Sequence, residues 1–371
     1  MLVGVPKEIK DHEHRIGLIP STVRELVSKG HRVLVETNAG RGVGISDDDY
    51  LAAGAEIVAG ADQVFDRAEL IVKVKEPLAE ERKQLKRGQI LFTYLHLAAD
   101  SRLAEDLIAA GVSAIAYETV TSPQGTLPLL IPMSQVAGRM ATQVGAHYLE
   151  KENGGRGVLL GGVPGVPPAD VFILGSGVVG TNAALIALGM GADVIMAGHL
   201  DSLRRAAAQL GSRLRTVVSE PQAIETLCRR ADLIIGAVLV PGAKAPKLIS
   251  APTVKAMKQG AVIVDVSIDQ GGCAETSRPT THTHPSYVVD GVVHYCVTNM
   301  PGAVARTSTF ALSSATSPFV LALADKGLKG ALAEDPHFAN GLNIYDGMVT
   351  NRAVAEALIL PYVPVQQALK R

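Results

Sequence analysis

The sequence has no tryptophan, few other aromatic residues (4%) and only three cysteines among its 371 residues. An odd and sparse set of cysteines argues against a disulfide framework and favours a reducing compartment. The spacing of Cys228, Cys273 and Cys296 fits no zinc-binding motif. We therefore expect a cytoplasmic protein that is stabilised by its hydrophobic core, with no metal site.

Excess charge and long apolar runs are also lacking. Lys and Arg total 35 against 36 Asp and Glu, a formal net charge of −1, so the basic footprint of a nucleic-acid-binding protein is absent. No uncharged apolar stretch approaches the ~18 residues of a transmembrane helix. The first ten residues, MLVGVPKEIK, lack the apolar region of a signal peptide. These absences leave small molecules as the expected partners, without nucleic acid or membrane.

Hydrophobic residues make up 47% of the chain, and glycine is abundant with 37 residues. A chain of this length exceeds one ordinary core and favours two domains. Short β-branched runs alternate with longer amphipathic runs, which is typical of α/β layering with parallel strands. The predicted strands are Leu2–Val5, Arg32–Glu36, Leu70–Val74, Ile90–Tyr94, Ser113–Ala116, Val158–Leu160, Ala169–Leu174, Asp193–Ala197, Leu233–Ala237, Ala261–Val266 and His294–Val297. The predicted helices are Pro20–Lys29, Glu80–Lys86, Ser101–Ala110, Ser134–Glu150, Val178–Gly189, Leu203–Gly211, Pro252–Lys258 and Arg306–Asp325, followed by a helical and loop-like tail.

The order of these elements predicts an α/β protein of two Rossmann-like domains with a cleft between them. We expect one domain to comprise residues 1–130 and 305–371, and the second, residues 131–304, to be inserted into it. The two long helices, Ser134–Glu150 and Arg306–Asp325, would join the domains. A cleft of this kind is a common place for small-molecule sites.

A glycine-rich turn follows the strand Ala169–Leu174 and leads directly into a helix. In this G-x-G-x-x-G pattern, Gly175 permits the tight turn, Gly177 lets the backbone approach a pyrophosphate, and Gly180 lets helix and strand pack closely. The helix start would then offer its free N–H groups to the anion. The turn predicts a dinucleotide site in the second domain. A second glycine run, Gly40–Gly44, has the wrong spacing and precedes acidic residues, so we interpret it as a turn and a helix cap.

One part of the dinucleotide pattern is missing. An acid is expected ~20 residues after the loop, at the end of the second strand, where it binds the ribose hydroxyls. Here that strand ends in Gly198 and His199. Without the acid, the repulsion of a 2′-phosphate is removed, and His199, Arg204 or Arg205 would favour binding of that phosphate. Asp201 is an alternative source of the hydrogen bond to the ribose hydroxyls. NAD is the expected cofactor, with tolerance of NADP left open.

Four polar residues lie at or near strand ends, where α/β folds place ligands. Arg15 lies in the charged loop after the first strand, Lys75 and His96 follow two further strands, and Asp269 follows the strand Ala261–Val266. Arg15 can clamp a carboxylate with two parallel hydrogen bonds, and His96 and Asp269 can transfer protons. From the residues alone, two interpretations stay open: the four side chains form one substrate site, or they are ordinary solvated residues that follow strands. The pair His282 and His284 is interpreted as a plain loop.

Several segments resemble the alanine dehydrogenase and transhydrogenase α-subunit family, and the resemblance runs over almost the whole chain. They are Val5–Ile9 (VPKEI), Glu13–Arg15 (EHR), Val74–Pro77 (VKEP), Leu95–Ala98 (LHLA), Ala237–Leu248 (AVLVPGAKAPKL), Ser267–Gly272 (SIDQGG) and Asn299–Ala303 (NMPGA). The run around His96 together with Pro241–Lys247 is similar to the alanine dehydrogenases in particular.

The resemblance implies a hexameric, NAD-dependent enzyme that interconverts L-alanine with pyruvate and ammonia. It implies that Arg15 and Lys75 bind the substrate, and that His96 and Asp269 carry the acid/base chemistry. The family's ribose-binding aspartate falls on Gly198 and a neighbouring lysine on Leu203, two departures that concern cofactor preference. The cofactor site implied in all is Ser134, Gly175, Gly177, Val178, Val179, Gly180, Gly198, Leu203, Ser219, Val238, Leu239, Val266, Ser267, Ile268, Asp269, Arg278, Val297, Thr298, Asn299 and Met300, with Met133 beside it.

Three other functions remain. A transhydrogenase α-subunit-like component would bind NAD(H) and pass hydride to a second protein, a role with no obvious need for Arg15, Lys75 and His96 together. A nucleotide-sensing protein with a dead active site would have lost one of the four candidate residues, and all four are present. A dehydrogenase that joins lysine to an oxo acid would need a larger pocket.

Overall fold

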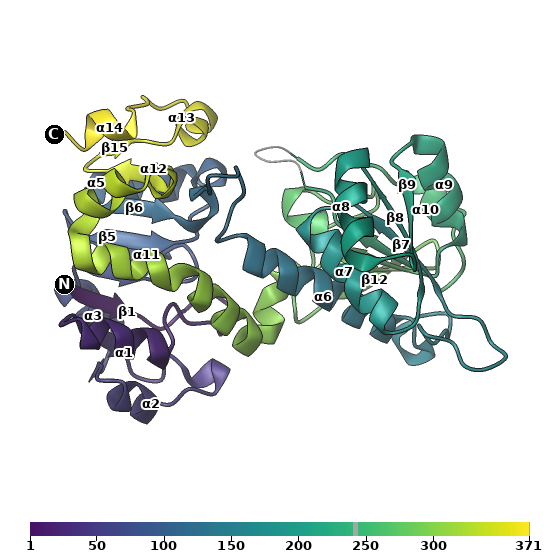
Figure 1. Ribbon diagram of the computed structural model, residues 1–371, viewed down its shortest axis with the longest axis horizontal. Helices are drawn as coiled ribbons and strands as arrows, with labels where there is room; N and C mark the ends of the chain where they lie inside the picture. Colours follow the sequence, from purple (N-terminus) through teal and green to yellow (C-terminus); the bar gives the residue numbers. More distant parts are fainter. Residues whose placement is uncertain (240–243, 371) are drawn as a thin grey trace. The chain divides into compact units, whose positions relative to one another are not determined.

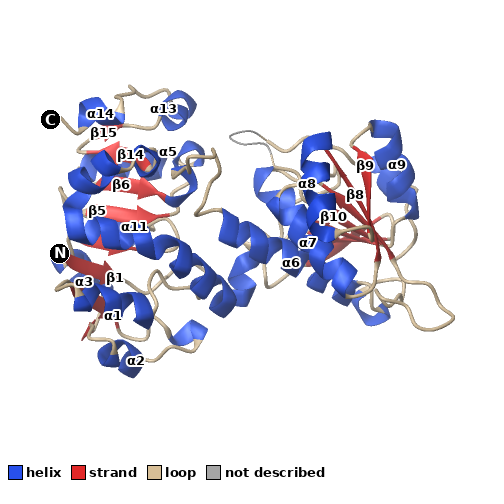
Figure 2. Ribbon diagram, viewed as in Figure 1, coloured by secondary structure: helices blue, strands red, loops and turns tan. Residues whose placement is uncertain are grey.

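The computed structural model describes residues 1–239 and 244–370, which divide into two compact units (Figure 1). Unit 1 comprises Met1–Met133 and Val304–Arg371, and unit 2 comprises Ser134–Ala303. Each unit is a sheet covered by helices, so the predicted α/β class with two Rossmann-like domains is confirmed (Figure 2). The long helices α6 (Ile131–Tyr148) and α11 (Ala305–Glu334) begin near the two points where the chain passes from one unit to the other.

The sheet of unit 1 has eight strands among the described residues, in the order β15-β14-β6-β5-β4-β1-β2-β3. The strands β1 to β6 are parallel, and the hairpin β14-β15 adds to β6 in antiparallel fashion. Their bounds are β1 Leu2–Val5, β2 Arg32–Glu36, β3 Glu56–Val58, β4 Leu70–Val72, β5 Ile90–Thr93, β6 Ser113–Ala116, β14 Leu342–Tyr345 and β15 Met348–Val349. The α-helices besides α11 are α1 Pro20–Ser28, α2 Asp47–Ala52, α3 Ala61–Arg67, α4 Ala79–Arg82, α5 Ser101–Ala110, α12 Pro336–Ala339, α13 Arg352–Leu358 and α14 Val365–Ala368.

The sheet of unit 2 has seven strands in the described part of the chain, in the order β12-β13-β11-β10-β7-β8-β9. All are parallel to their neighbours except the edge strand β12. Their bounds are β7 Asp170–Leu174, β8 Asp193–Gly198, β9 Leu214–Val218, β10 Leu233–Gly236, β11 Val262–Asp265, β12 Ser286–Val289 and β13 Val292–Tyr295. The α-helices besides α6 are α7 Val178–Gly189, α8 Leu200–Leu210, α9 Pro221–Arg230 and α10 Ala251–Lys255.

Apart from the edge strands at one side, the two sheets have the same strand order. In each, the first strand lies at the centre, the second and third extend to one side, and the fourth and fifth extend to the other, followed by β6 in unit 1 and by β13 in unit 2. This is the doubly wound arrangement, in which ligands bind outside the carboxyl ends of the strands where the strand order reverses. That point lies beside β1 and β4 in unit 1, and beside β7 and β10 in unit 2.

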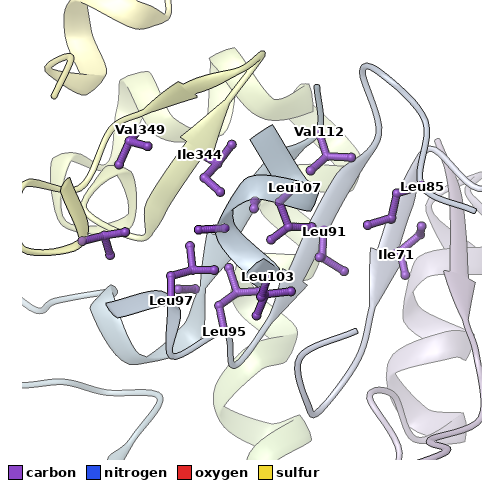
Figure 3. Close-up of a cluster of buried hydrophobic side chains, with 14 of the residues drawn as sticks. Ile71, Leu85, Leu91, Leu95, Leu97, Leu103, Leu107, Val112, Ile344 and Val349 are labelled. Atoms are coloured by element: carbon purple, nitrogen blue, oxygen red, sulfur yellow. The ribbon is translucent and has the colours of Figure 1, made fainter. Parts of the chain in front are cut away.

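Aliphatic side chains form the cores of both units. In unit 1, Leu91 of β5 and Leu103 and Leu107 of α5 pack with Ile344 of β14 and Val349 of β15 (Figure 3). In unit 2, a second cluster joins Phe172 and Ile234 of the sheet to Ile224 of α9 and Val254 of α10. Burial of a side chain of this size stabilises the fold by about 1.5–3 kcal/mol. The two cores hold the strand ends in fixed positions.

Several predicted boundaries were wrong. Residues 158–160 lie outside the strands, because the surrounding segment takes turns at Gly157 and Gly162, both with positive φ. The tail contains the hairpin β14-β15, whose strands are too short to show an alternating pattern. The strand predicted at Leu70–Val74 ends at Val72, and the one predicted at His294–Val297 is β13, which begins earlier. The edge strands β3 and β9 were not predicted, because β3 has only three residues and the middle of β9 exposes Arg215 and Thr216.

The second glycine run forms a turn and a helix cap, as predicted. Arg41–Val43 is a single 3-10 turn, and Ser46 then caps α2. The Ser46 side chain accepts a hydrogen bond from the backbone N–H of Asp49, and the Asp49 side chain accepts one from the backbone of Ser46. This reciprocal capping box uses the carboxylate of Asp49 at the helix start.

Candidate active site

Arg15 lies in the long loop between β1 and α1, with only 2% of its surface exposed. Its Nε donates to Oε1 of Glu13 at 2.7 Å, and its Nη2 donates to Oε2 of Glu13 at 2.5 Å. The two parallel hydrogen bonds expected of Arg15 are therefore made, but to a carboxylate of the protein itself. Burial alone would raise the pKa of Glu13, yet the hydrogen bonds and the charge of Arg15 lower it to about 2. Glu13 thus holds the guanidinium plane in place.

The remaining nitrogen of Arg15, Nη1, lies 3.1 Å from the sulfur of Met133. A cavity of about 460 Å³ opens beside Arg15, and it lies within unit 1. Its lining is rich in charged and polar side chains: Lys7, Glu8, Glu13, His14, Arg15, Asn38 and Arg41, with Ala39 and Gly42. Charged side chains of both signs line the cavity, so it suits a small polar ligand better than an apolar one.

Lys75 follows β4 and is half-buried. Burial lowers the pKa of its ammonium group, and the nearby positive charge of Arg15 lowers it further. The two predicted substrate-binding cations, Arg15 and Lys75, follow the neighbouring parallel strands β1 and β4. A single buried carboxylate fixes the backbone here: Oε1 of Glu8 accepts hydrogen bonds from the N–H groups of Val74 at 2.6 Å and Lys75 at 3.3 Å.

Sequence reasoning missed the buried ion cluster that supports Lys75. Nζ of Lys73 is fully buried and donates to Glu8 at 3.1 Å and to Glu81 at 2.7 Å. A lysine inside an otherwise apolar run, Val72-Lys73-Val74, was the available signal, because a buried charge requires a partner. Removal of one partner from such a cluster usually costs about 3–5 kcal/mol.

His96 follows β5 and has a left-handed backbone with φ of 51°. This conformation is uncommon outside glycine, and one carboxylate holds it: Oε1 of Glu118 accepts the His96 N–H at 2.5 Å and the Leu95 N–H at 3.2 Å. The imidazole itself is half exposed, with Nδ1 3.9 Å from Glu118 and its ring stacked on Tyr94. His96 is therefore fixed by its backbone while its ring faces solvent.

Glu118 was not predicted, although the rule that identified Lys75 and His96 applies to it. It follows β6, a parallel strand next to β5 in the sheet. Together, the ends of β4, β5 and β6 and the loop after β1 bring Arg15, Lys75 and His96 to the same edge of unit 1. Asp269, the fourth predicted residue, belongs to unit 2.

The glycine-rich turn of unit 2 has the geometry that its spacing predicts. Gly175 has φ of 112°, and a Cβ there would lie 2.3 Å from the carbonyl oxygen of Ala237. A Cβ on Gly180 would lie 1.9 Å from the oxygen of Gly175, so only glycine permits this packing. A Cβ on Gly177, by contrast, would meet no described atom within 4 Å. The turn is thus tight against the protein on two sides and open at its middle glycine.

The helix α7 begins in this opening, with Gly177 as its N-cap and no side chain capping it. No acidic residue lies in its first turn, where Val178 and Val179 precede Gly180. Free N–H groups at a helix start form a ready anion site. The residues present therefore fit the pyrophosphate of a dinucleotide, the group that the sequence predicts there.

Most of the other predicted cofactor residues of unit 2 lie at or after the carboxyl ends of its parallel strands. Gly198 ends β8 and Ser219 follows β9, with the Ser219 N–H bonded to the Gly198 oxygen at 3.1 Å. Val238 and Leu239 follow β10, with Leu239 exposed. The remaining strand-end residues are Val266, Ser267, Ile268 and Asp269 after β11, and Val297, Thr298, Asn299 and Met300 after β13. Ser134 lies on α6 and Leu203 is buried on α8. The motif segment 240–243 lies outside the described residues.

A buried carboxylate, also missed from the sequence, organises the segment that carries Asp269. Oδ1 of Asp265 accepts the N–H of Ser267 at 3.1 Å. Its Oδ2 accepts the N–H of Cys273 at 2.8 Å and the hydroxyl of Ser277 at 2.6 Å. Asp265 thus ties both ends of the 3-10 turn Val266–Gln270, and Asp269 is exposed within it.

Arg278 is supported by stacked rings. Its guanidinium lies 4.2 Å from the centre of the Tyr287 ring, and that ring stacks on His294. The Tyr287 hydroxyl accepts the Arg278 N–H at 2.8 Å and donates to the Thr276 oxygen at 2.9 Å. Burial lowers the pKa of His294, which favours the neutral ring in this stack. Both the backbone and the side chain of Arg278 are therefore positioned.

Among the residues that the structure describes, no group of three His, Cys, Asp or Glu side chains is arranged to hold a metal ion. His282 instead lies in a loop, with Nε2 3.2 Å from the Asn299 oxygen. Within residues 1–239 and 244–370, no helix is both long and apolar enough to cross a membrane. All three cysteines are buried free thiols.

The doubly wound sheet of unit 2 and its glycine-rich turn define the class of dinucleotide-binding α/β proteins. Family models give the particular assignment. The N-terminal domain of the alanine dehydrogenase/PNT family matches residues 4–137, and its C-terminal domain matches residues 141–352. The chain belongs to the alanine dehydrogenase/PNT family.

Individual relatives agree with this assignment over their full length. The chain is 60% identical to an alanine dehydrogenase of Halomonas elongata, over 98% of both chains. It is 54% identical to an alanine dehydrogenase of Mycolicibacterium smegmatis, over 100% of both chains. A solved L-alanine dehydrogenase is 53% identical, with a TM-score of 0.94 over 97% of this chain and 99% of that one. A transhydrogenase from Sinorhizobium meliloti, 23% identical with a TM-score of 0.81, shares the fold.

Proposed function

We propose that this protein is an oxidoreductase that interconverts L-alanine with pyruvate and ammonia, with NAD(H) as cofactor. The observation that carries the proposal is the presence, in one chain, of a glycine turn suited to pyrophosphate and a strand-end cluster of Arg15, Lys75 and His96. Full-length identity of 54–60% to proteins named alanine dehydrogenase supports the same substrate. It also favours this function over a transhydrogenase component.

In this proposal residues 1–130 and 305–371 form the substrate domain. Arg15, whose guanidinium plane is held by Glu13, binds the carboxylate of pyruvate or alanine. Lys75 donates to the substrate carbonyl oxygen, and its lowered pKa allows a proton to be given up more readily than from an ordinary lysine. Two cations near one another favour an anionic oxo acid over a neutral ketone.

His96 and Asp269 carry the proton transfers. His96 shuttles protons to and from the reacting oxygen and nitrogen, and its fixed backbone with an exposed ring suits this task. Asp269 handles ammonia, which attacks the carbonyl carbon of pyruvate, and water, which attacks the imine carbon in the reverse direction. A positioned group of either kind usually contributes roughly 10²–10⁴-fold to turnover.

Residues 131–304 form the dinucleotide-binding domain of this proposal. The backbone N–H groups after Gly177 hold the pyrophosphate, and the strand-end residues from Ser219 to Met300 surround the rest of the cofactor. When bound, the nicotinamide accepts a hydride from the substrate carbon or returns it. Because Gly198 cannot repel a 2′-phosphate, tolerance of NADP(H) is part of the proposal.

The proposed assembly is a homo-hexamer in the cytoplasm, as the family resemblance implies, and the buried free thiols suit a reducing compartment. Light scattering after size exclusion measures the assembly directly. A mass of one or two chains would contradict the hexamer.

The test of the reaction is the absorbance of reduced nicotinamide, followed with purified protein, pyruvate, ammonium and NADH. We expect oxidation that requires both pyruvate and ammonium, and the reverse reaction with L-alanine and NAD⁺. Oxidation that ignores ammonium, or none despite measurable NADH binding, would contradict the proposal. The second outcome would return the transhydrogenase-like and sensing functions to consideration.

A further inference from the structure

The carboxyl end of β8 carries Gly198 where dinucleotide-binding folds usually place an acid. The residue is buried, and its surroundings are occupied. A Cβ at Gly198 would lie 1.9 Å from Oγ and 2.7 Å from Cβ of Ser176. Both distances are far below van der Waals contact, so no side chain fits at position 198 while Ser176 stays in place. Ser176, which lies between Gly175 and Gly177, thus occupies the space that an acidic side chain at position 198 would need.

Ser176 is itself held in that place. It is 8% exposed, and its Oγ lies 2.5 Å from Oγ of Ser202 in the first turn of α8. The Ser202 hydroxyl also lies 2.9 Å from the carbonyl oxygen of His199, to which it donates. A chain of two neutral hydroxyl groups therefore stands at the end of β8 in place of a carboxylate.

The exchange changes the chemistry of this position. A carboxylate accepts hydrogen bonds from ribose hydroxyls and repels a phosphate. A serine hydroxyl both donates and accepts, so it can serve a ribose hydroxyl or a phosphate oxygen. At the start of α8, the helix that carries Ser202, the carboxylate of Asp201 lies 3.4 Å from the guanidinium of Arg204.

We infer that Ser176 and Gly198 form one coupled specificity element that lets the adenosine-ribose site accept either a 2′-hydroxyl or a 2′-phosphate. This inference rests on the proposed function, since it concerns the cofactor site named there. It goes further in assigning the selection to Ser176 as well as to Gly198. An acid restored at position 198 requires the serine to be removed first.

The test combines two substitutions. Gly198→Asp alone places its side chain against Ser176, so we expect weak binding of both cofactors and a lower melting temperature. In Ser176→Gly/Gly198→Asp the space is open, and we expect tight NADH binding with a Kd for NADPH at least ~100-fold higher. The wild type should bind NADH and NADPH with Kd values within ~10-fold of one another.

The readout is fluorescence of the reduced nicotinamide during titration, which requires neither pyruvate nor ammonium. Ser212→Ala is the matched control, because this exposed serine lies beyond the end of α8 and should leave both Kd values unchanged. A wild type that binds NADPH ~100-fold more weakly than NADH would overturn the inference. So would a single Gly198→Asp variant as stable and selective as the double variant.

The same samples separate this inference from the proposed function. Binding that follows the expected pattern, without any turnover of pyruvate and ammonium, would count against the proposed reaction and support the inference. Turnover of pyruvate and ammonium with NADH, combined with negligible NADPH binding, would support the proposed reaction but overturn this inference together with the proposed NADP(H) tolerance. Failure of the wild type to bind either cofactor would overturn both.

Discussion

The two units share one strand order and differ in the loop that follows the first strand. In unit 2 the loop after β7 is only three residues long, Gly175 to Gly177, before α7 begins at Val178. In unit 1 the loop after β1 runs to the start of α1 at Pro20 and contains Glu8, Glu13 and Arg15. The short loop offers backbone N–H groups, whereas the long one offers charged side chains.

This difference explains how one architecture supports two tasks. A glycine turn at a helix start binds a phosphate group through its backbone N–H groups, which suits a dinucleotide cofactor that must be bound and released in each cycle. A long loop at the same edge can place side chains of chosen charge and pKa, as chemistry on a carbonyl requires. The shared strand order sets where each ligand site lies, and the loop after the first strand determines the chemistry of that site. A substitution in one unit should therefore change one of these tasks and leave the other intact.

The largest expected effect is on turnover, from unit 1. In His96→Ala we expect kcat to fall by roughly 10²–10⁴-fold, the usual contribution of a positioned acid/base group. The Kd for NADH should stay unchanged, since the cofactor turn lies in unit 2. His147→Ala, which removes an exposed imidazole on α6, is the control and should retain full turnover. A near-normal kcat in His96→Ala would contradict the role of His96 in proton transfer.

The next effect is on stability and depends on pH. The pKa of Glu13 is lowered from 4.5 to about 2 in the folded state. A lowered folded-state pKa contributes stability above the unfolded value, and this stability is lost as pH falls through the folded value. We expect Glu13→Gln to lower the free energy of unfolding by about 3 kcal/mol near neutral pH.

That difference should shrink as pH falls from about 4.5 to about 2, because Glu13 becomes protonated in the wild type too. Urea denaturation of both proteins across this range measures it. Glu69→Gln, a change at an exposed carboxylate, is the control and should leave stability almost unaltered. A constant difference between wild type and Glu13→Gln at all pH values would contradict the ion pair as its cause.

A smaller effect is expected on cofactor binding, from unit 2. Gly177→Ala adds a methyl group that meets no described protein atom within 4 Å. The melting temperature should therefore change little, but the methyl group would stand where the pyrophosphate approaches, so the Kd for NADH should rise at least ~10-fold. Gly189→Ala near the end of the same helix also has open space and should bind NADH normally. Unchanged binding in Gly177→Ala would place the pyrophosphate elsewhere.

The smallest effect concerns the support of His96. Glu118→Gln keeps an oxygen that can accept the His96 N–H but removes the negative charge beside the ring. We expect kcat to fall by ~2–10-fold, because the left-handed backbone at His96 loses part of the charge-assisted hydrogen bonding that holds it. Steady-state kinetics of the purified variant measure the change. Unchanged kcat would show that the negative charge of Glu118 is not needed to position His96.

The fold was predictable wherever burial gives a strong local pattern. The strands Leu2–Val5, Arg32–Glu36 and Ser113–Ala116 and the helix Val178–Gly189 agree with the structure residue for residue. Elements whose stability comes from distant partners were not predictable in this way. The hairpin β14-β15 exists because it pairs with β6, more than 200 residues away in sequence.

The candidate site was predictable where a residue follows a strand, and less so where it acts through another residue. Strand ends pointed to Lys75, His96 and Asp269, and glycine spacing pointed to the turn at Gly175. The supporting carboxylates Glu8, Glu13 and Asp265 were not recognised, because a sequence does not show which N–H groups a carboxylate accepts. The clash between Ser176 and a Cβ at Gly198 is likewise visible only in three dimensions.

The division of tasks between the two units is tested most directly by one titration of NADH, performed on His96→Ala and Gly177→Ala alongside the wild type. The account predicts that His96→Ala binds NADH as the wild type does although its turnover is lost, and that only Gly177→Ala binds it weakly. Weakened NADH binding in His96→Ala, or normal binding in Gly177→Ala, would contradict it.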